Sequence, residues 1–256
     1  MKPSVAIVTG ASQGIGRATA LRLAKDFSGV VLAARNGEAL QEVAAEVKKR
    51  GADSLTAALD LRTKESAENL VNQTLTRFGR IDALVNIAGA VPQIDLFEMT
   101  DAQWQDGLEL KFHGARRLTI LAWDALKASQ GSVVLMSGSA ALDPKPGFAA
   151  VAAINAAIIA MAKAFAEQGI EDGVQVNSVV PGPVMSHRRK TFMEKWAPAH
   201  GMTVEEATEK FPTQAGISRY GTPEEVADLM AFLVSPAAKW LTGTSVRIDG
   251  GEIKGI

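Results

Sequence analysis

Short apolar runs alternate with longer amphipathic stretches along the whole chain, and this alternation limits the possible folds more than any other feature. The runs are rich in Val, Ile and Leu and lie at residues 4–10, 29–35, 54–61, 81–89, 131–138, 173–182 and 244–251. Helical patterns lie between them, at 36–51, 63–79, 101–128, 147–165 and 223–234. Continuous apolar runs are typical of strands buried on both faces. The order therefore predicts an α/β, doubly wound (Rossmann) fold with a seven-stranded parallel sheet.

The chain has no linker, repeat or low-complexity segment, which predicts a single domain over residues 1–256. Its 47% of apolar residues are enough for one well-buried core. The longest irregular stretch runs from 183 to 222. Because loops of that length in compact domains are usually functional, we expect it to be a substrate lid.

Charge and cysteine content exclude several classes of partner. The net charge is −1 without a basic stripe, so we expect no nucleic-acid partner. The chain contains no cysteine, which excludes disulfides, thiolate chemistry and cysteine-based metal sites; we expect no metal. The apolar run at the N-terminus is too short for a signal peptide, and Asn155 and Lys163 interrupt the longest apolar helix. We therefore expect a soluble, cytoplasmic protein that does not contact a membrane.

The first apolar run leads directly into "TGASQGIGRATALRLA", which places Gly10, Gly14 and Gly16 between a strand and a helix. Glycines at such a turn let the backbone approach a pyrophosphate, which the N-terminus of the following helix binds. A glycine triplet alone could also form a plain tight turn. Its position in the first strand–helix unit of an alternating chain favours dinucleotide binding.

Six segments together resemble the short-chain dehydrogenase/reductase family over essentially the whole chain: "TGASQGIG", "LDL", "NIAG", "NSVVPGPVMS", "RYGTPEEVADLMAFLVSP" and "TGTSVRIDGG". The resemblance implies an oxidoreductase that forms a homo-oligomer, either a dimer or a homotetramer. It also implies the following cofactor-binding residues: Gly10, Ser12, Gln13, Gly14, Ile15, Gly16, Arg35, Asp60, Leu61, Asn86, Ala88, Gly89, Pro181, Gly182, Val184 and Ser186.

The resemblance implies that each group of residues contacts a different part of the cofactor. Asp60 corresponds to a residue that contacts adenine, and "NIAG" to a turn along the adenine ribose. The segment from 181 to 186 corresponds to residues that hold the nicotinamide amide. Asp60 could alternatively be an ordinary turn residue at the end of a strand.

The end of the second apolar run favours NADP(H) over NAD(H). Relatives that use NAD carry an acid at the position of Ala34, whereas NADP users often have a neutral residue there and an arginine next, as Arg35 is here. A guanidinium can bind a 2′-phosphate with two hydrogen bonds. Gln13 departs from this pattern, because many NADP users have a second basic residue at its position. Arg35 could otherwise be a solvated residue at the start of a helix.

The usual catalytic residues of the family are replaced when the chain is aligned on these motifs without a gap. Val151 stands at the position of the tyrosine, Asn155 at that of the lysine, Gly138 at that of the serine and Lys111 at that of the asparagine. The only tyrosine, Tyr220, is far away in the sequence. Other proton sources are water and a few polar side chains that we expect to be packed or solvated: His113, Asp143, Lys145 and His187.

Lys111 and Asn155 are the candidate catalytic residues. The family has an asparagine at the first position and a lysine at the second, and this chain has the same two residue types in the opposite order. We expect Lys111 to reach Asn155 and the nicotinamide ribose, with a lowered pKa if it is buried. It could instead point to solvent or to a subunit interface. Three functions remain open: an NADP(H)-dependent oxidoreductase with a non-standard active site, an inactive nucleotide-binding pseudoenzyme that acts as a sensor or partner subunit, and non-redox chemistry. The substrate is not predicted.

Overall fold

Seven parallel strands form one sheet in the computed structural model, which describes residues 4–255. The strands follow the order β3-β2-β1-β4-β5-β6-β7 across the sheet. Their bounds are β1 Val5–Thr9, β2 Gly29–Ala34, β3 Asp53–Ala58, β4 Ala83–Asn86, β5 Ser132–Met136, β6 Gln175–Pro181 and β7 Ser245–Ile248. The predicted α/β, single-domain Rossmann fold is confirmed over these residues; positions 1–3 and 256 of the predicted domain lie outside them.

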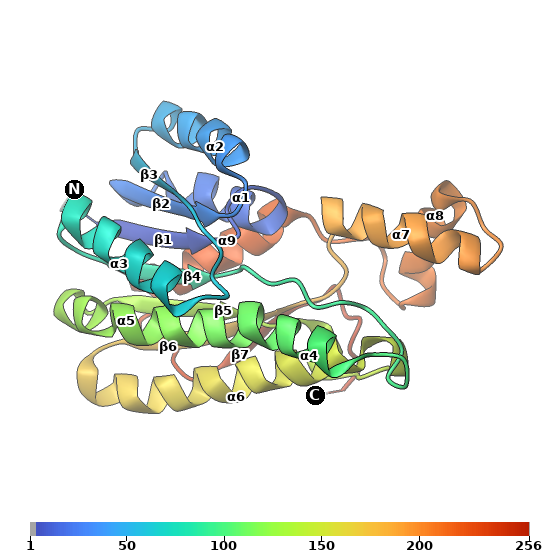
Figure 1. The fold of residues 1–256 in the computed structure, drawn as a ribbon. Coiled ribbons are helices and arrows are strands. Elements are labelled where there is room, and N and C mark those ends of the chain that lie inside the picture. The colour runs from blue at the N-terminus through green and yellow to red at the C-terminus, as the bar shows by residue number, and fades with distance from the viewer. Residues whose placement is uncertain (1–3, 256) are drawn as a thin grey trace.

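Helices cover both faces of the sheet (Figure 1). One face packs against α1 (Gly14–Leu23), α2 (Gly37–Lys49) and α9 (Pro223–Leu233). The other packs against α3 (Lys64–Phe78), α5 (Gly114–Ser129) and α6 (Ala149–Asp172). The inner strands β1, β2, β4, β5 and β6 are buried on both faces, which explains their apolar runs in the sequence, whereas the edge strands β3 and β7 are partly exposed.

The helix predicted over 101–128 is not continuous, which corrects the expectation. It consists of α4 (Asp101–Gly107), a π-helical segment (Leu108–His113) and α5. A π-helical turn holds one more residue than an α-helical turn and is frequent at functional sites. This turn contains Lys111.

The prediction of an irregular segment over 183–222 is wrong. The segment contains two helices, α7 (His187–Ala199) and α8 (Val204–Gln214), which extend beyond the sheet in Figure 1. Ser186 caps α7, and Thr203 forms a capping box at the start of α8. We call α7 and α8 the lid helices.

Helix α6 combines a buried face with an exposed one. The segment Pro146–Asp172 is the one helix among residues 4–255 that is long and apolar enough to cross a membrane by length and composition, and 33% of its most apolar window is buried. Ile154, Ile158 and Ala162 form the buried side and belong to the apolar cores. Short 3-10 turns complete the chain at Ser139–Ala141, Pro146–Phe148 and Pro236–Ala238.

Candidate active site

The turn between β1 and α1 has the close backbone packing that only glycine allows. Gly10 and Gly14 have φ angles of 68° and 54°, a region that side chains other than glycine rarely adopt. A Cβ atom on Gly16 would lie 2.0 Å from the carbonyl oxygen of Gly10. Gln13 begins α1 without a side-chain cap, so the first N–H groups of this helix stay free for an anion.

A cleft of about 390 Å³ opens above this turn, at the carboxyl ends of the strands. Twelve of the sixteen predicted cofactor residues line it: Gly10, Ser12, Gln13, Gly14, Ile15, Gly16, Arg35, Asp60, Leu61, Ala88, Gly89 and Ser186. Four do not: Asn86, Pro181, Gly182 and Val184. Buried Asn86 donates to Thr119, and Val184 pairs with the backbone of Gly221, so these residues support the wall from behind.

Further residues line the cleft, most of them apolar, and of these the sequence had singled out Ala34 and His187. They are Ala33, Ala34, Asn36, Ala39, Leu59, Ile87, Ala90, Leu110, Met136, His187 and Arg188. Asn36 had a readable signal, because its side chain caps α2 by accepting from the Ala39 N–H. Arg188 had no such signal in the sequence, because its hydrogen bonds are to Gly89 and Val91, which are distant in the chain.

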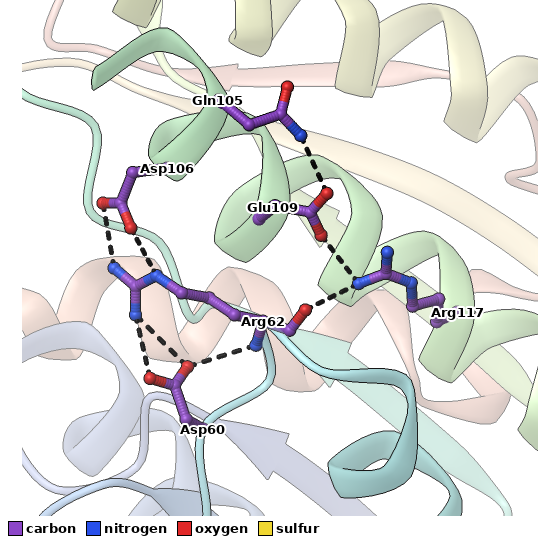
Figure 2. A network of polar contacts seen from close by, with 6 residues as sticks. All are labelled: Asp60, Arg62, Gln105, Asp106, Glu109 and Arg117. Atoms are coloured by element: carbon purple, nitrogen blue, oxygen red, sulfur yellow. Dashed lines mark hydrogen bonds and ion pairs between the residues drawn. The ribbon is translucent and has the colours of Figure 1, made fainter. Parts of the chain in front are cut away.

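At the far end of the cleft, Arg62 holds together three segments of the chain (Figure 2). Its guanidinium donates to both carboxylate oxygens of Asp60, at 3.2 and 3.1 Å, and to those of Asp106 in α4, at 2.7 and 3.0 Å. Arg117 of α5 donates to the backbone carbonyl of Arg62 and to Glu109 in the π-helical segment. The network therefore connects the predicted adenine end of the cleft to the helix that contains Lys111.

This network also lowers the pKa of Asp106. The hydrogen bond from Arg62 is the main cause that holds the pKa of Asp106 below its ordinary value, and Arg35 adds a smaller attraction. Arg35 thus lies close enough to Asp106 to influence it. At this end of the cleft, Arg62 is paired with Asp60 and Asp106, whereas Arg35 lines the cleft itself.

Lys111 turns inward from the π-helical segment and is only 8% exposed. Its Nζ donates to Oδ1 of Asn155, which is 2% exposed on α6, and to the carbonyl oxygen of Ser137 at 3.3 Å. Burial, assisted by the charge of Arg188, lowers the pKa of Lys111 to about 7. The expected approach of Lys111 to Asn155 is therefore present in the structure.

The other two positions singled out in the sequence lie beside this pair. A Cβ atom on Gly138 would come within 2.9 Å of Nδ2 of Asn155, so the amide occupies the space next to this glycine. Val151 lies one turn before Asn155 on α6 and packs against a small apolar cluster. Ser137 donates to the carbonyl oxygen of Asn155, at 2.9 Å, and so fixes the backbone there.

Gly89 and Arg188 hold the Lys111 side chain in place. A Cβ on Gly89 would lie 2.9 Å from Cδ of Lys111, so this glycine makes room for the lysine stem. Arg188 donates to the carbonyl oxygens of Gly89 and Val91, at 3.3 and 3.1 Å. These two hydrogen bonds connect the start of α7 to the segment that follows β4.

The remaining polar candidates have other surroundings. His113 packs against Phe112, and its Nδ1 is buried without a partner among the described residues. Asp143 and Lys145 form an exposed ion pair, at 2.9 Å. His187 lines the cleft but is exposed. None of them contacts the Lys111–Asn155 pair through a hydrogen bond within residues 4–255.

The chain is similar to known reductases over its full length. The family described as enoyl-(acyl carrier protein) reductase matches residues 10–252. A 3-oxoacyl-(acyl-carrier-protein) reductase from Synechocystis is 33% identical over 252 residues, which cover 97% of this chain and 96% of that protein.

Two solved structures share the fold closely. The L-sorbose reductase from Gluconobacter frateurii, in complex with NADPH and L-sorbose, has a TM-score of 0.94 and 29% identity and covers 100% of this chain and 98% of its own. An actinorhodin polyketide ketoreductase with NADPH has a TM-score of 0.91 and 30% identity, covering 98% and 97%.

Proposed function

The chain belongs to the short-chain dehydrogenase/reductase family, and we propose that it is an NADP(H)-dependent oxidoreductase with a non-standard active site. One observation carries the proposal: Lys111, a buried lysine with a pKa of about 7, hydrogen-bonds Asn155, and its stem packs against Gly89, which lines the dinucleotide-type cleft. A lysine that titrates near neutral pH is suited to donate a proton. We place the protein, as a soluble enzyme, in the cytoplasm.

The residues of the cleft fit a nicotinamide dinucleotide. The packed glycines and the uncapped start of α1 suit a pyrophosphate, and Arg35 follows Ala34 where a 2′-phosphate would lie. Two structural relatives contain NADPH, which supports the same cofactor here. NADPH supplies the hydride when bound. Asp60 is held by Arg62, so it would present a fixed carboxylate edge to the adenine.

The four positions occupied by Gly138, Val151, Asn155 and Lys111 stand, in our proposal, for the usual catalytic residues of the family. Val151 has no proton to donate, and Gly138 has no side chain to hydrogen-bond a carbonyl oxygen. In the reductive direction Lys111 donates the proton, and Asn155 holds its ammonium by accepting a hydrogen bond. Burial makes this proton easier to lose than that of an ordinary lysine.

The test is NADPH oxidation, followed by its absorbance, across a panel of ketones and aldehydes. We expect slow but saturable turnover, well below about 10 s⁻¹ with simple ketones, because only one side chain assists the carbonyl. No turnover with any carbonyl compound would contradict the proposal.

The presence of Val151 and Gly138 at the positions of the usual tyrosine and serine favours one alternative, an NADP(H)-binding pseudoenzyme that acts as a sensor or partner subunit. It predicts tight NADPH binding without turnover and co-purification with an active homologue. The absorbance measurement therefore separates the two functions.

A further inference from the structure

The turn that follows β3 contacts both the cofactor cleft and helix α4, which continues into the π-helical segment. Three residues of this turn line the cleft: Leu59, Asp60 and Leu61. The next residue, Arg62, is not among the lining residues, and its guanidinium extends to Asp106 of α4 (Figure 2). A ligand that contacts Asp60 therefore contacts a carboxylate that is bonded to Arg62.

Arg62 binds two carboxylates with one planar group. Its Nε and Nη2 donate to the two oxygens of Asp106, at 2.7 and 3.0 Å, and its Nη1 donates to both oxygens of Asp60. The backbone N–H of Arg62 also donates to Asp60, at 3.1 Å. A two-bond contact between a guanidinium and a carboxylate fixes orientation as well as distance. The positions of Asp60 and Asp106 therefore depend on each other.

The backbone of the same turn contacts the π-helical segment Leu108–His113 through Arg117. The carbonyl oxygen of Arg62 accepts from Nη1 of Arg117, at 2.7 Å, and the same nitrogen donates to Glu109 within the segment, at 2.9 Å. The turn thus contacts this helix at two places, at Asp106 just before the segment and at Glu109 inside it. Both contacts pass through Arg62.

The direction of Lys111 depends on the π-helical turn that contains it. π-helical turns are rare and occur mostly as short insertions in α-helices, frequently at functional sites. Because an α-helical turn holds one residue fewer, a return to the α-helical form would rotate the following side chains by about 100°. Lys111 would then no longer point to Asn155, with which it forms a hydrogen bond here.

From these contacts we infer that Arg62 is a positioning residue, through which nucleotide binding controls how firmly Lys111 is held. A nucleotide in the cleft restrains the turn at Asp60, and Arg62 passes this restraint to Asp106 and the π-helical segment. Lys111 is then held more firmly toward Asn155 when the cofactor is bound. This inference rests on the proposed function, because it requires a nucleotide in the cleft.

Hydrogen exchange of the full chain, with and without saturating adenosine 2′,5′-bisphosphate, tests this inference. The probe is the adenine half of NADPH and has no nicotinamide, so it lacks the reacting end of the cofactor. We expect it to slow the exchange of the amides in Leu108–His113 about fivefold. Leu110 of this segment also lines the cleft, so the test must separate the route through Arg62 from direct contact with this leucine.

Asp106→Asn separates the two routes, because it weakens the bond between Arg62 and α4 but leaves Asp60 and the residues that line the cleft in place. The slowing should then fall below about twofold, although calorimetry should show nearly wild-type affinity for the probe. Asp106→Glu keeps the carboxylate and should retain the slowing. Asp124→Asn, which changes an exposed acid of α5, is the control and should behave as the wild type.

The inference is overturned if Asp106→Asn binds the probe and slows exchange as the wild type does, since direct contact with Leu110 would then explain the effect. It is also overturned if the control loses the slowing, or if the probe binds the wild type without slowing exchange. In these cases the proposed function stands. If neither the probe nor NADPH binds the wild type, the proposed function fails and the inference fails with it.

Discussion

Lys111 is the central residue of the proposed active site, and the burial of its ammonium group lowers the stability of the folded protein. A lysine whose pKa is lowered in the folded protein binds fewer protons there than in the unfolded chain. The free energy of unfolding should therefore rise as pH increases from about 7 toward 10.5, where both states become neutral. Below about 7 the full cost of the buried ammonium is present.

The first prediction follows from this increase in the free energy of unfolding with pH. Lys111→Met should stabilise the protein at pH 6 by roughly 1–4 kcal/mol, because it removes a buried charge and keeps the apolar stem. The advantage should shrink at pH 9. Urea unfolding at the two pH values measures both effects. An equal effect at pH 6 and pH 9 would show that the lysine does not titrate in this range.

Arg35 carries the second prediction at this scale. Arg35→Ala should weaken NADPH binding about tenfold or more and leave NADH binding nearly unchanged, because only NADPH has a 2′-phosphate. Calorimetry with both nucleotides measures the effect. Lys49→Ala, which removes an exposed cation of the following helix α2, serves as the control. Equal affinity of the wild type for both nucleotides would contradict the assignment.

At the scale of elements, the π-helical segment depends on contacts from outside its own helix. Arg62 bonds Asp106 on one side of this segment, and Arg117 bonds Glu109 within it. A Cβ atom on Gly114, just after the segment, would lie 2.8 Å from the carbonyl oxygen of Leu61, so the two backbones pack closely. These contacts fix where Lys111 enters the site.

The third prediction concerns this support. Arg62→Met should increase hydrogen exchange of the amides in Leu108–His113 about fivefold, equivalent to about 1 kcal/mol for a partly exposed network. Mass spectrometry of the corresponding peptides measures the exchange. Lys64→Met, an exposed cation two residues further on, should leave it unchanged. If the two variants exchange alike, the network does not support the segment.

The sequence could not predict this segment or the lid helices, for physical reasons. One extra residue in a helical turn leaves the apolar pattern on both sides nearly intact, so 101–128 is expected to be one helix. The lid helices contain Pro198 and Pro212 and few buried residues, which hides their periodicity. The start of α8 has a readable signal, because Thr203 and Glu206 form a capping box.

At the scale of the molecule, the outward face of α6 bears mainly small apolar side chains. Ala153, Ala156, Ala160 and Ala164 are exposed there, and α5 lies beside this helix in Figure 1. Ile170, at the end of α6, is 66% exposed. We propose that this face forms an interface in a homo-oligomer, because alanines allow close packing of helices.

The fourth prediction tests this interface. Sedimentation equilibrium should find a dimer or tetramer for the wild type and a smaller species for Ala160→Arg, since the long charged side chain would be buried between subunits. Lys163→Arg, an exposed position on the same helix that keeps its charge, is the control. A monomeric wild type would contradict the proposal.

The fold and part of the site could be predicted because they depend on short, local signals. Strands buried on both faces leave continuous apolar runs, and Gly10, Gly14 and Gly16 mark the turn that binds a nucleotide. The approach of Lys111 to Asn155 could be expected only through the resemblance, which places both positions in one pocket. The contact between Arg62 and Asp106, which are 44 residues apart, has no local signal and becomes visible only in the folded chain.

If Lys111 donates the proton, NADPH oxidation must depend on pH through the ionisation of this lysine. With a carbonyl compound that the wild type reduces, kcat should fall as pH rises through about 7, because Lys111 must be protonated to donate. Lys111→Met should lower kcat by about 10²–10⁴-fold and remove this pH dependence, while NADPH still binds. A variant that keeps the wild-type kcat and pH profile would contradict the claim.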